Sequence, residues 1–173
     1  WYRGNWKSGI WKNGEWSSGT WHYGDWYDGD WISGVWHNGT WYKGYWHTGL
    51  WKKGSWMSGV WVSGAWEHGD WGSGAWHQGK WNGGTWHNGT WHKGDWFGGV
   101  WKGGTWHGGV WHGSIFSDST WLGGEWKGGH WLGGVWKNGV WSAGVWLDGG
   151  WMNGFWHNGI WNGGEWHGGT WYG

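Results

Sequence analysis

The sequence predicts an all-β solenoid built from W-x-x-G-x pentapeptide repeats, with two or four repeats in each coil and a core of stacked Trp. Three observations predict this fold. The 173 residues include 34 Trp and 45 Gly. Trp recurs every five residues, and Gly stands three residues after each Trp with few exceptions. A period of five suits neither a helix nor a continuous strand, so we expect the chain to turn once in every repeat.

The two regular alternatives fail for separate reasons. On a helix, successive Trp would step by about 140° around the axis and no single face would collect them. Gly in every turn would also cost about 1 kcal/mol per site relative to Ala. On a continuous strand, side chains alternate between two faces, so both faces would be covered with indole. A short extended segment followed by a corner lets every Trp point the same way.

Each place of the repeat fits this scheme. The fifth place often carries Val, Ile or Thr, which favour extended backbone. The third place is rich in Ser, Asn, Asp and Gly, which favour turns, and Gly at the fourth place can adopt a positive φ at the corner. We expect the Trp inside, because this many exposed indoles would form a very large apolar surface. In the central repeats the expected core and corner residues are Trp86, Trp91, Trp96, Gly89, Gly94 and Gly99.

The number of repeats per coil is predicted from the fifth place. β-branched residues occupy eleven of the seventeen fifth places whose numbers end in 0, but only six of the seventeen that end in 5. Alternate repeats therefore differ in environment, which favours two or four repeats per coil over three. This interpretation predicts parallel pairing between residues ten or twenty apart.

The repeat also resembles a known family. In Gly89-Thr90-Trp91-His92-Lys93 a small residue stands two places before a large apolar one. Pentapeptide-repeat proteins are similar in layout, with a small residue two places before a central Leu or Phe. The resemblance implies a four-sided, right-handed β-solenoid with one pentapeptide on each side. Trp and Gly replace the Leu or Phe and the Ala-like residue of that family, so the resemblance is architectural.

Composition excludes several classes of function. Eleven basic and eleven acidic residues are scattered singly, so we expect no nucleic-acid partner. No apolar run approaches the roughly 20 residues of a membrane helix, and we expect no membrane partner. Cys is absent, which excludes disulfides. Residues 1–173 read as a single continuous solenoid that starts in phase with the repeat, and we expect it to be a fragment of a longer chain.

The twelve His are the main candidates for chemistry. Three pairs lie ten residues apart and would be adjacent in a two-sided coil: His37 and His47, His77 and His87, and His157 and His167. No carboxylate accompanies these pairs regularly, so solvated surface His is favoured over a metal site. Nucleophile, base and orienting acid do not recur together. We therefore expect no enzyme, no cofactor and no metal.

One segment, residues 111–120, breaks the pattern. Gly is lost from the fourth place at Ser114 and Ser119, Phe116 replaces Trp, and Asp118 adds a charge. We favour a tolerated defect in the rod. The alternative is a docking segment formed by these residues, because loops on rigid scaffolds often carry binding residues.

The resulting functional hypothesis is a structural, non-catalytic rod, fibre or spacer element of an extracellular or virion-type assembly. Its length would be set by the number of repeats. The solenoid ends would expose indole and strand edges, so we expect self-association or neighbouring domains there. The alternative is a surface-binding module for carbohydrate or, with less support, ice. The Thr residues form no uninterrupted series that would favour ice.

Overall fold

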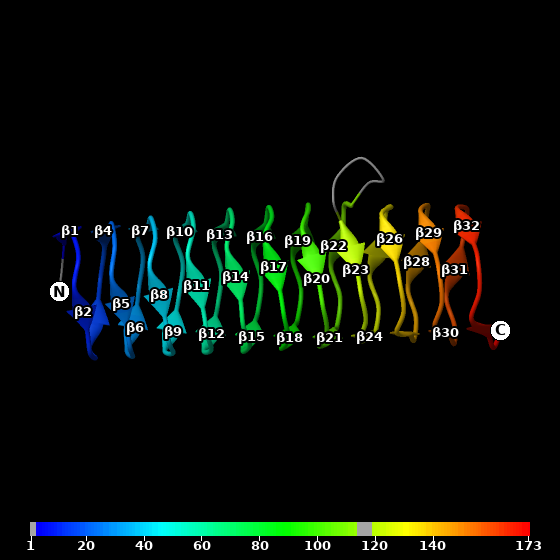
Figure 1. Ribbon diagram of the computed structural model, residues 1–173, viewed down its shortest axis with the longest axis horizontal. Helices are drawn as coiled ribbons and strands as arrows, with labels where there is room; N and C mark the ends of the chain where they lie inside the picture. Colours follow the sequence, from blue (N-terminus) through cyan, green and yellow to red (C-terminus); the bar gives the residue numbers. More distant parts are fainter. Residues whose placement is uncertain (1–2, 114–118) are drawn as a thin grey trace.

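The computed structural model describes residues 3–113 and 119–173, which form one elongated solenoid of short strands (Figure 1). Strands of successive coils pair in parallel and build three sheets of eleven strands each. At about 4.8 Å between paired strands, eleven coils give a rod about 50 Å long. The predicted all-β solenoid is confirmed. Within the described residues, no helix is long and apolar enough to cross a membrane.

The three sheets run along the three sides of the rod. Sheet A consists of β1 (Gly4–Trp6), β4 (Gly19–Trp21), β7 (Val35–Trp36), β10 (Leu50–Trp51), β13 (Ala65–Trp66), β16 (Lys80–Trp81), β19 (Asp95–Trp96), β22 (Val110–Trp111), β25 (His130–Trp131), β28 (Val145–Trp146) and β31 (Ile160–Trp161). Sheet B consists of β2 (Ile10–Trp11), β5 (Asp25–Trp26), β8 (Thr40–Trp41), β11 (Ser55–Trp56), β14 (Asp70–Trp71), β17 (Thr85–Trp86), β20 (Val100–Trp101), β23 (Thr120–Trp121), β26 (Val135–Trp136), β29 (Gly150–Trp151) and β32 (Glu165–Trp166). Sheet C consists of β3 (Glu15–Trp16), β6 (Asp30–Trp31), β9 (Tyr45–Trp46), β12 (Val60–Trp61), β15 (Ala75–Trp76), β18 (Thr90–Trp91), β21 (Thr105–Trp106), β24 (Glu125–Trp126), β27 (Val140–Trp141), β30 (Phe155–Trp156) and β33 (Thr170–Trp171).

Each regular coil contains three repeats, so the prediction of two or four repeats per coil is wrong. Thr90 pairs with Ala75 on one side and with Thr105 on the other, each fifteen residues away. The four sides implied by the family resemblance are corrected in the same way. With three repeats per coil, fifth places ending in 0 and in 5 alternate along each sheet, except across the additional repeat, where Val100 pairs with Thr120, and they alternate around each coil as well. The compositional alternation therefore distinguishes neighbouring repeats both along a sheet and around a coil, and it does not indicate an even number of sides.

The indoles explain why three sides are favoured. Every Trp from Trp16 to Trp156 is fully buried. Within a coil, neighbouring rings meet edge to face, as Trp86 and Trp91 do at 5.9 Å between ring centroids and 77° between planes. Three such rings fill the interior of a triangular coil, and protein interiors tolerate few voids.

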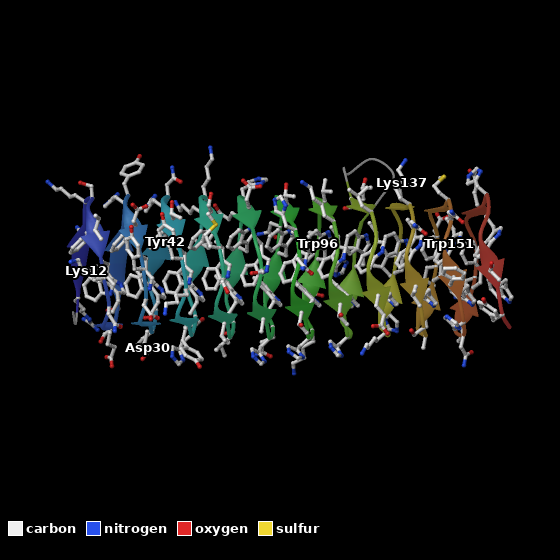
Figure 2. All side chains as sticks on the ribbon, turned by 60° about the horizontal axis from the view of Figure 1, so that its bottom comes forward. Lys12, Asp30, Tyr42, Trp96, Lys137 and Trp151 are labelled. Atoms are coloured by element: carbon white, nitrogen blue, oxygen red, sulfur yellow. The ribbon has the colours of Figure 1, made fainter. Side chains whose placement is uncertain are left out.

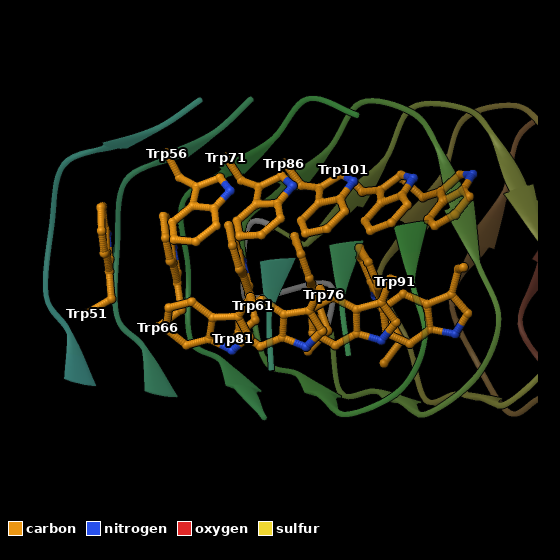
Figure 3. Packing of buried hydrophobic residues seen from close by; sticks show 14 of the residues in the cluster. Trp51, Trp56, Trp61, Trp66, Trp71, Trp76, Trp81, Trp86, Trp91 and Trp101 are labelled. Atoms are coloured by element: carbon orange, nitrogen blue, oxygen red, sulfur yellow. The ribbon is translucent and has the colours of Figure 1, made fainter. Parts of the chain in front are cut away.

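Successive coils stack these rings into three columns (Figure 3). Trp76 lies under Trp91 with centroids 4.8 Å apart and planes 5° apart. Parallel and edge-to-face contacts are both favourable arrangements of aromatic rings. At about 25 cal/mol per Å², burial of an indole of 150–250 Å² contributes several kcal/mol as an upper bound. The columns therefore provide the main apolar stabilisation of the rod.

Gly at the fourth place is required by the corner, as Gly89 illustrates. Its φ is +122°, a value that L side chains rarely adopt. A Cβ at Gly89 would also overlap the carbonyl oxygen of Gly74 in the preceding coil. The Gly89 N–H donates to the Asn88 side-chain oxygen at 2.8 Å, which explains Asn at the third place. Gly94 and Gly99 have positive φ values as well, +134° and +101°.

Candidate interaction surface

Two columns of outward side chains cover each sheet. The fifth-place residue precedes each buried Trp and the second-place residue follows it, so both point away from the core. Figure 2 shows Asp30 and Lys137 at the lower and upper edges of the rod, with Trp96 and Trp151 inside. Lys12 and Tyr42 are exposed as well. Backbone hydrogen bonds between coils fix the spacing of both columns. The Thr90 N–H donates to the Gly74 carbonyl oxygen at 2.9 Å, and the His92 N–H donates to the Trp76 carbonyl oxygen at 2.8 Å. A surface site on this rod therefore combines residues of one repeat with residues of the repeats about fifteen positions before and after it.

The predicted core residues lie together in the interior. Trp86 belongs to the column behind sheet B, Trp91 to that behind sheet C and Trp96 to that behind sheet A. All three are fully buried. They have no exposed ring face for a ligand, so along the part of the rod from Trp16 to Trp156 a binding surface on the sides is formed by second-, third- and fifth-place residues.

The irregular segment changes the register by one repeat. Val100 pairs with Thr120 and Val110 pairs with His130, so residues twenty apart are adjacent here. Three of the predicted docking residues, Ser114, Phe116 and Asp118, lie outside the described residues. Ser119 is 2% exposed, and its carbonyl oxygen accepts the Val135 N–H at 3.1 Å. Its side chain is buried at a corner, so it does not form part of an exposed surface.

Ser119 also shows how the array tolerates loss of a corner Gly. Gly134, the next residue in the same corner column, has a φ of +104°. Ser119 does not have a positive φ, because in the described parts of the chain only Gly residues do. A Cβ added at Gly134 would lie 2.7 Å from the Ser119 carbonyl oxygen. The Ser side chain is thus accommodated by a different backbone conformation at the one coil that has an additional repeat.

The His pairs predicted from ten-residue spacing are not adjacent, because adjacency follows the fifteen-residue coil. The structure instead stacks His77 on His92 at 4.8 Å and His92 on His107 at 5.2 Å between ring centroids. Within residues 3–113 and 119–173, no group of three or more His, Asp or Glu is arranged to hold a metal ion. Sequence reasoning missed this column because it used the wrong coil length.

Stacking changes the acid–base properties of the central imidazole. Partial desolvation lowers the pKa of His92 below its usual 6.5, and the neighbouring His77 and His107 lower it further. On sheet A, desolvation and then the charge of Lys52 lower the pKa of His37 in the same direction. Both rings therefore favour the neutral form more strongly than an isolated His does.

An apolar strip occupies one end of sheet A. We define it by six outward residues: Phe97, Val110, Leu132, Val145, Leu147 and Ile160. Pairing of Val110 with His130, of His130 with Val145 and of Val145 with Ile160 places the fifth-place members in one column. Phe97, Leu147 and Ile160 are 38%, 40% and 57% exposed. Reading the sequence at fifteen-residue spacing, with one additional repeat at 111–120, would have revealed this strip.

The corners beside the first part of the strip, from Phe97 to Leu132, carry little side-chain bulk. Gly98, Gly113 and Gly133 occupy third places on one side, and Gly108 and Gly128 occupy third places on the other. Farther along, Asp148 and Asn158 occupy the third places beside Leu147 and Ile160. Asp95 at one end of the strip accepts a hydrogen bond from His112, with 3.1 Å between the carboxylate oxygen and the ring nitrogen. The strip is therefore a flat surface on which another flat surface could approach the sheet closely.

The sheet B surface presents a different pattern. Tyr27 and Tyr42 stack with centroids 4.5 Å apart and planes 13° apart. Each ring thereby covers one face of the other, which leaves less ring surface for stacking on a sugar. Beside them, Lys43 Nζ lies 2.9 Å from Asp28. This lysine and the Gly29 N–H hold the pKa of Asp28 below its usual value of 3.8.

These features define a three-sided parallel β-solenoid with a core of stacked Trp and with outward columns at fifteen-residue spacing. Its surface combines an apolar strip, a His column and isolated ion pairs. Comparison of the chain with protein-family models, curated proteins and solved structures finds no match.

Proposed function

We propose that the protein is a structural, non-catalytic rod that serves as a fibre or spacer element in an extracellular or virion-type assembly. The uninterrupted burial of Trp from Trp16 to Trp156 carries the proposal. Such a core gives a stiff element whose length is proportional to the number of coils. The kinship with pentapeptide-repeat proteins remains part of this proposal, at the level of a coil made from pentapeptides.

The surface offers little support for catalysis. The hollow lined by Ile10, Lys12 and Tyr27 contributes an amine and a phenol but no imidazole or carboxylate. A second hollow on sheet B gathers Ser55, Asp70 and His87, but His87 Nε2 lies 3.8 Å from the Asp70 carboxylate, beyond hydrogen-bond distance. The stacked His column faces solvent on sheet C, and its rings contact one another instead of a nucleophile. An enzyme would require nucleophile, base and orienting groups within hydrogen-bond reach.

Rod length is the direct test. Deleting residues 61–90 removes two whole coils and leaves the order of the three sheets unchanged. We expect the particle to shorten by about 10 Å, because each coil adds about 4.8 Å. Small-angle scattering or electron microscopy measures the change. An unchanged length, or collapse into a compact particle, would contradict a rod with additive coils.

The assembly partner proposed for the apolar strip is a second copy of this chain. Two flat sheet faces can pack about 10 Å apart, and the low corners beside the strip permit that approach. In the two sheet A columns that contain the strip, no Lys or Arg occurs from Asp95 to Ile160, but His130 lies between Val110 and Val145, and His112 stacks on Phe97 at 4.5 Å between ring centroids. A second copy would cover the apolar side chains of each strip with those of the other. We infer lateral association, in addition to contacts of the solenoid ends with neighbouring domains or copies.

A matched pair of substitutions tests lateral association. Leu147 in the strip and Leu122 on sheet B are both second-place residues, 40% and 41% exposed. We expect Leu147→Lys to weaken self-association in sedimentation experiments and Leu122→Lys to leave it unchanged. Equal effects of the two substitutions would remove the strip from the proposal while leaving the rod itself unaffected.

Carbohydrate binding remains the alternative function, with the exposed aromatic residues as the platform. It predicts that soluble sugars quench or shift the fluorescence of the protein. The rod proposal predicts blue-shifted Trp emission that acrylamide quenches poorly and sugars leave unchanged, because the interior indoles are fully buried.

A further inference from the structure

The three Trp columns are continuous over the length of the rod. The column behind sheet C runs from Trp16 to Trp171, and its neighbouring rings are 4.7–5.3 Å apart between centroids. The additional repeat at 111–120 does not interrupt them. Trp101 and Trp121 stack at 4.8 Å, Trp106 and Trp126 at 4.8 Å, and Trp111 and Trp131 at 4.7 Å.

The columns are also connected to one another. Trp86, Trp91 and Trp96 follow in sequence and belong to three different columns. Trp86 lies 5.9 Å from Trp91, and Trp91 lies 5.9 Å from Trp96, in edge-to-face contacts. Each interior indole thus contacts rings above and below it and rings in both other columns. A path along the rod can therefore pass around a defect in any single column.

Indole is among the most easily oxidised neutral side chains. When it loses one electron, it becomes a radical cation, and a neighbouring indole in contact can refill the vacancy because the two sites have nearly the same energy. The vacancy, or hole, then moves in steps from ring to ring. Successive contacts near 5 Å are favourable for such transfer, since electron transfer weakens steeply with separation between rings.

A hole becomes trapped when the radical cation loses its Nε1 proton to a base or to water. Trp86, Trp91 and Trp96 are fully buried, and their Nε1 atoms have no hydrogen-bond partner among the described residues. Trp136 and Trp141 donate to the backbone carbonyl oxygens of Asn153 and Asn158, each at 3.1 Å. A carbonyl oxygen is too weak a base to remove the proton, so the charge stays on the rings and can move.

We propose that the Trp columns conduct one-electron holes along the rod. A one-electron oxidant at one coil removes an electron from an indole, electrons shift ring by ring toward that coil, and a one-electron reductant at a distant coil supplies the replacement. No bond forms or breaks in the columns, and one electron is transferred overall. The partners are thus one-electron oxidants and reductants that contact the rod beside a column. This activity is independent of the structural role.

The chain contains its own reporter for the test. Tyr2, Tyr23, Tyr27, Tyr42 and Tyr45 all lie near the N-terminal end, and only Tyr172 lies at the other end. In a Tyr172→Phe background, a ruthenium polypyridyl photo-oxidant is attached at Ser142→Cys, which is unique because the chain has no native Cys. Exposed Tyr such as Tyr27, which is 42% exposed, can release its proton to water and trap the hole as a tyrosyl radical. Electron paramagnetic resonance measures its yield after a light pulse.

Two triple variants with the same composition separate conduction from packing. Trp86→Phe, Trp91→Phe and Trp96→Phe together interrupt all three columns in consecutive repeats, because Phe preserves an aromatic ring but is much harder to oxidise. Trp71→Phe, Trp86→Phe and Trp101→Phe interrupt only the column behind sheet B. We expect the first variant to lose the tyrosyl signal and the second to retain it. The background is the signal from unlabelled protein mixed with free oxidant, and the first variant should fall to that level.

A positive control shows that the interrupted variant is still competent. Moving the photo-oxidant from Ser142→Cys to Ala75→Cys places it on the Tyr side of the interruption, and the tyrosyl signal should return. Loss of the signal in both triple variants, failure of the Ala75→Cys control, or retention of the signal in both would overturn conduction through the columns. None of these results bears on rod length, so this proposal and the structural one are tested separately.

Discussion

Trp91 shows what a single residue contributes to the rod. Its ring lies 4.8 Å from Trp76 and 4.8 Å from Trp106 in its column, and it contacts Trp86 and Trp96 edge to face. Because four rings surround it, truncation leaves a cavity that neighbouring side chains cannot fill without breaking their own stacking. Each interior Trp therefore contributes to the free energy of unfolding, and truncation of any one of them should lower it substantially.

We predict that Trp91→Ala lowers the free energy of unfolding by about 3–5 kcal/mol, the range for truncation of large aromatic residues in a core. Trp91→Phe keeps a ring in the column and should cost less. Urea denaturation measures both. A change for Trp91→Ala within about 0.5 kcal/mol, as at exposed positions, would contradict the core assignment.

Adjacent glycines in one corner differ sharply in what they tolerate. Gly104 has a φ of +105°, and a Cβ there would overlap the Gly89 carbonyl oxygen. A Cβ at Gly103 would meet only the His87 carbonyl oxygen, at an ordinary 3.6 Å. We predict that Gly104→Ala destabilises the protein by about 1–3 kcal/mol or more, through backbone strain and crowding.

Gly103→Ala is the matched control, and it should be neutral or slightly stabilising because Ala restricts the unfolded chain more than Gly. Thermal unfolding of both variants provides the comparison. Similar losses at the two positions would show that the corner requires Gly for another reason.

The stacked His column predicts a pH dependence of stability. Folding lowers the pKa of His92, so below about pH 6.5 the unfolded chain binds more protons than the folded one. The free energy of unfolding should therefore be unaffected by His92 above that pH. It should decrease as the pH falls from the pKa of His92 in the unfolded chain toward its lower pKa in the folded protein. His92→Asn should flatten this part of the profile, as measured by urea denaturation between pH 7 and pH 5. An unaltered slope would assign the dependence to other groups.

At the scale of the strand and corner, the pentapeptide predicted most of what the structure contains. Trp inside, Gly at a corner with positive φ and polar residues outside all follow from the size of indole and the dihedral freedom of Gly. Coil length did not follow, because the fifth-place residues lie outside the core and do not measure its width. The packing of three indoles determines that width, and it becomes apparent only from the contact between rings such as Trp86 and Trp91. The apolar strip could not be found until the coil length was known.

The irregular segment gives a prediction at this scale. Deleting residues 115–119 together with Ser114→Gly produces the continuous sequence Trp-His-Gly-Gly-Thr-Trp across the junction. Pairing across it should then occur at fifteen residues throughout, as in the other coils, and stability should be unchanged or higher. Thermal unfolding and the fluorescence of the Trp core measure this result. Loss of the fold would show that the segment is required structurally, and loss of self-association with the fold preserved would support the docking hypothesis.

For the whole molecule, the equivalence of the three columns has a testable effect. Deleting one repeat, residues 76–80, lets Trp81 take the place of Trp76, so the core should remain complete. The later repeats should each move to the next sheet, which rotates the surface of one half of the rod by a third of a turn relative to the other half. The fold should thus persist while the surface columns are exchanged.

Engineered Cys pairs can detect this rotation, since the chain has no Cys and a disulfide requires Cα atoms about 4.4–6.8 Å apart. In the intact protein Ala75 is the partner of Thr90, so Ala75→Cys should cross-link with Thr90→Cys and not with Asp95→Cys. In the deletion variant the preference should reverse. An unchanged preference would mean that the chain absorbs the deletion locally.

The step in register at residues 111–120 has a consequence for how such an array changes during evolution. Gain or loss of the codons for one pentapeptide should be harmless to the core, because each repeat supplies one Trp. It would, however, move every later residue to the next face of the rod. Gain or loss of fifteen residues preserves the faces and alters only the length. An additional pentapeptide that lacks Trp, as at Ile115–Ser119, is accompanied by twenty-residue pairing that keeps the sheets in order on both sides. An array of this kind can therefore grow by one pentapeptide at a time. Where the surface is under selection, the insertions that persist should be groups of three repeats or single repeats that have lost their Trp, because these keep later residues on the same faces.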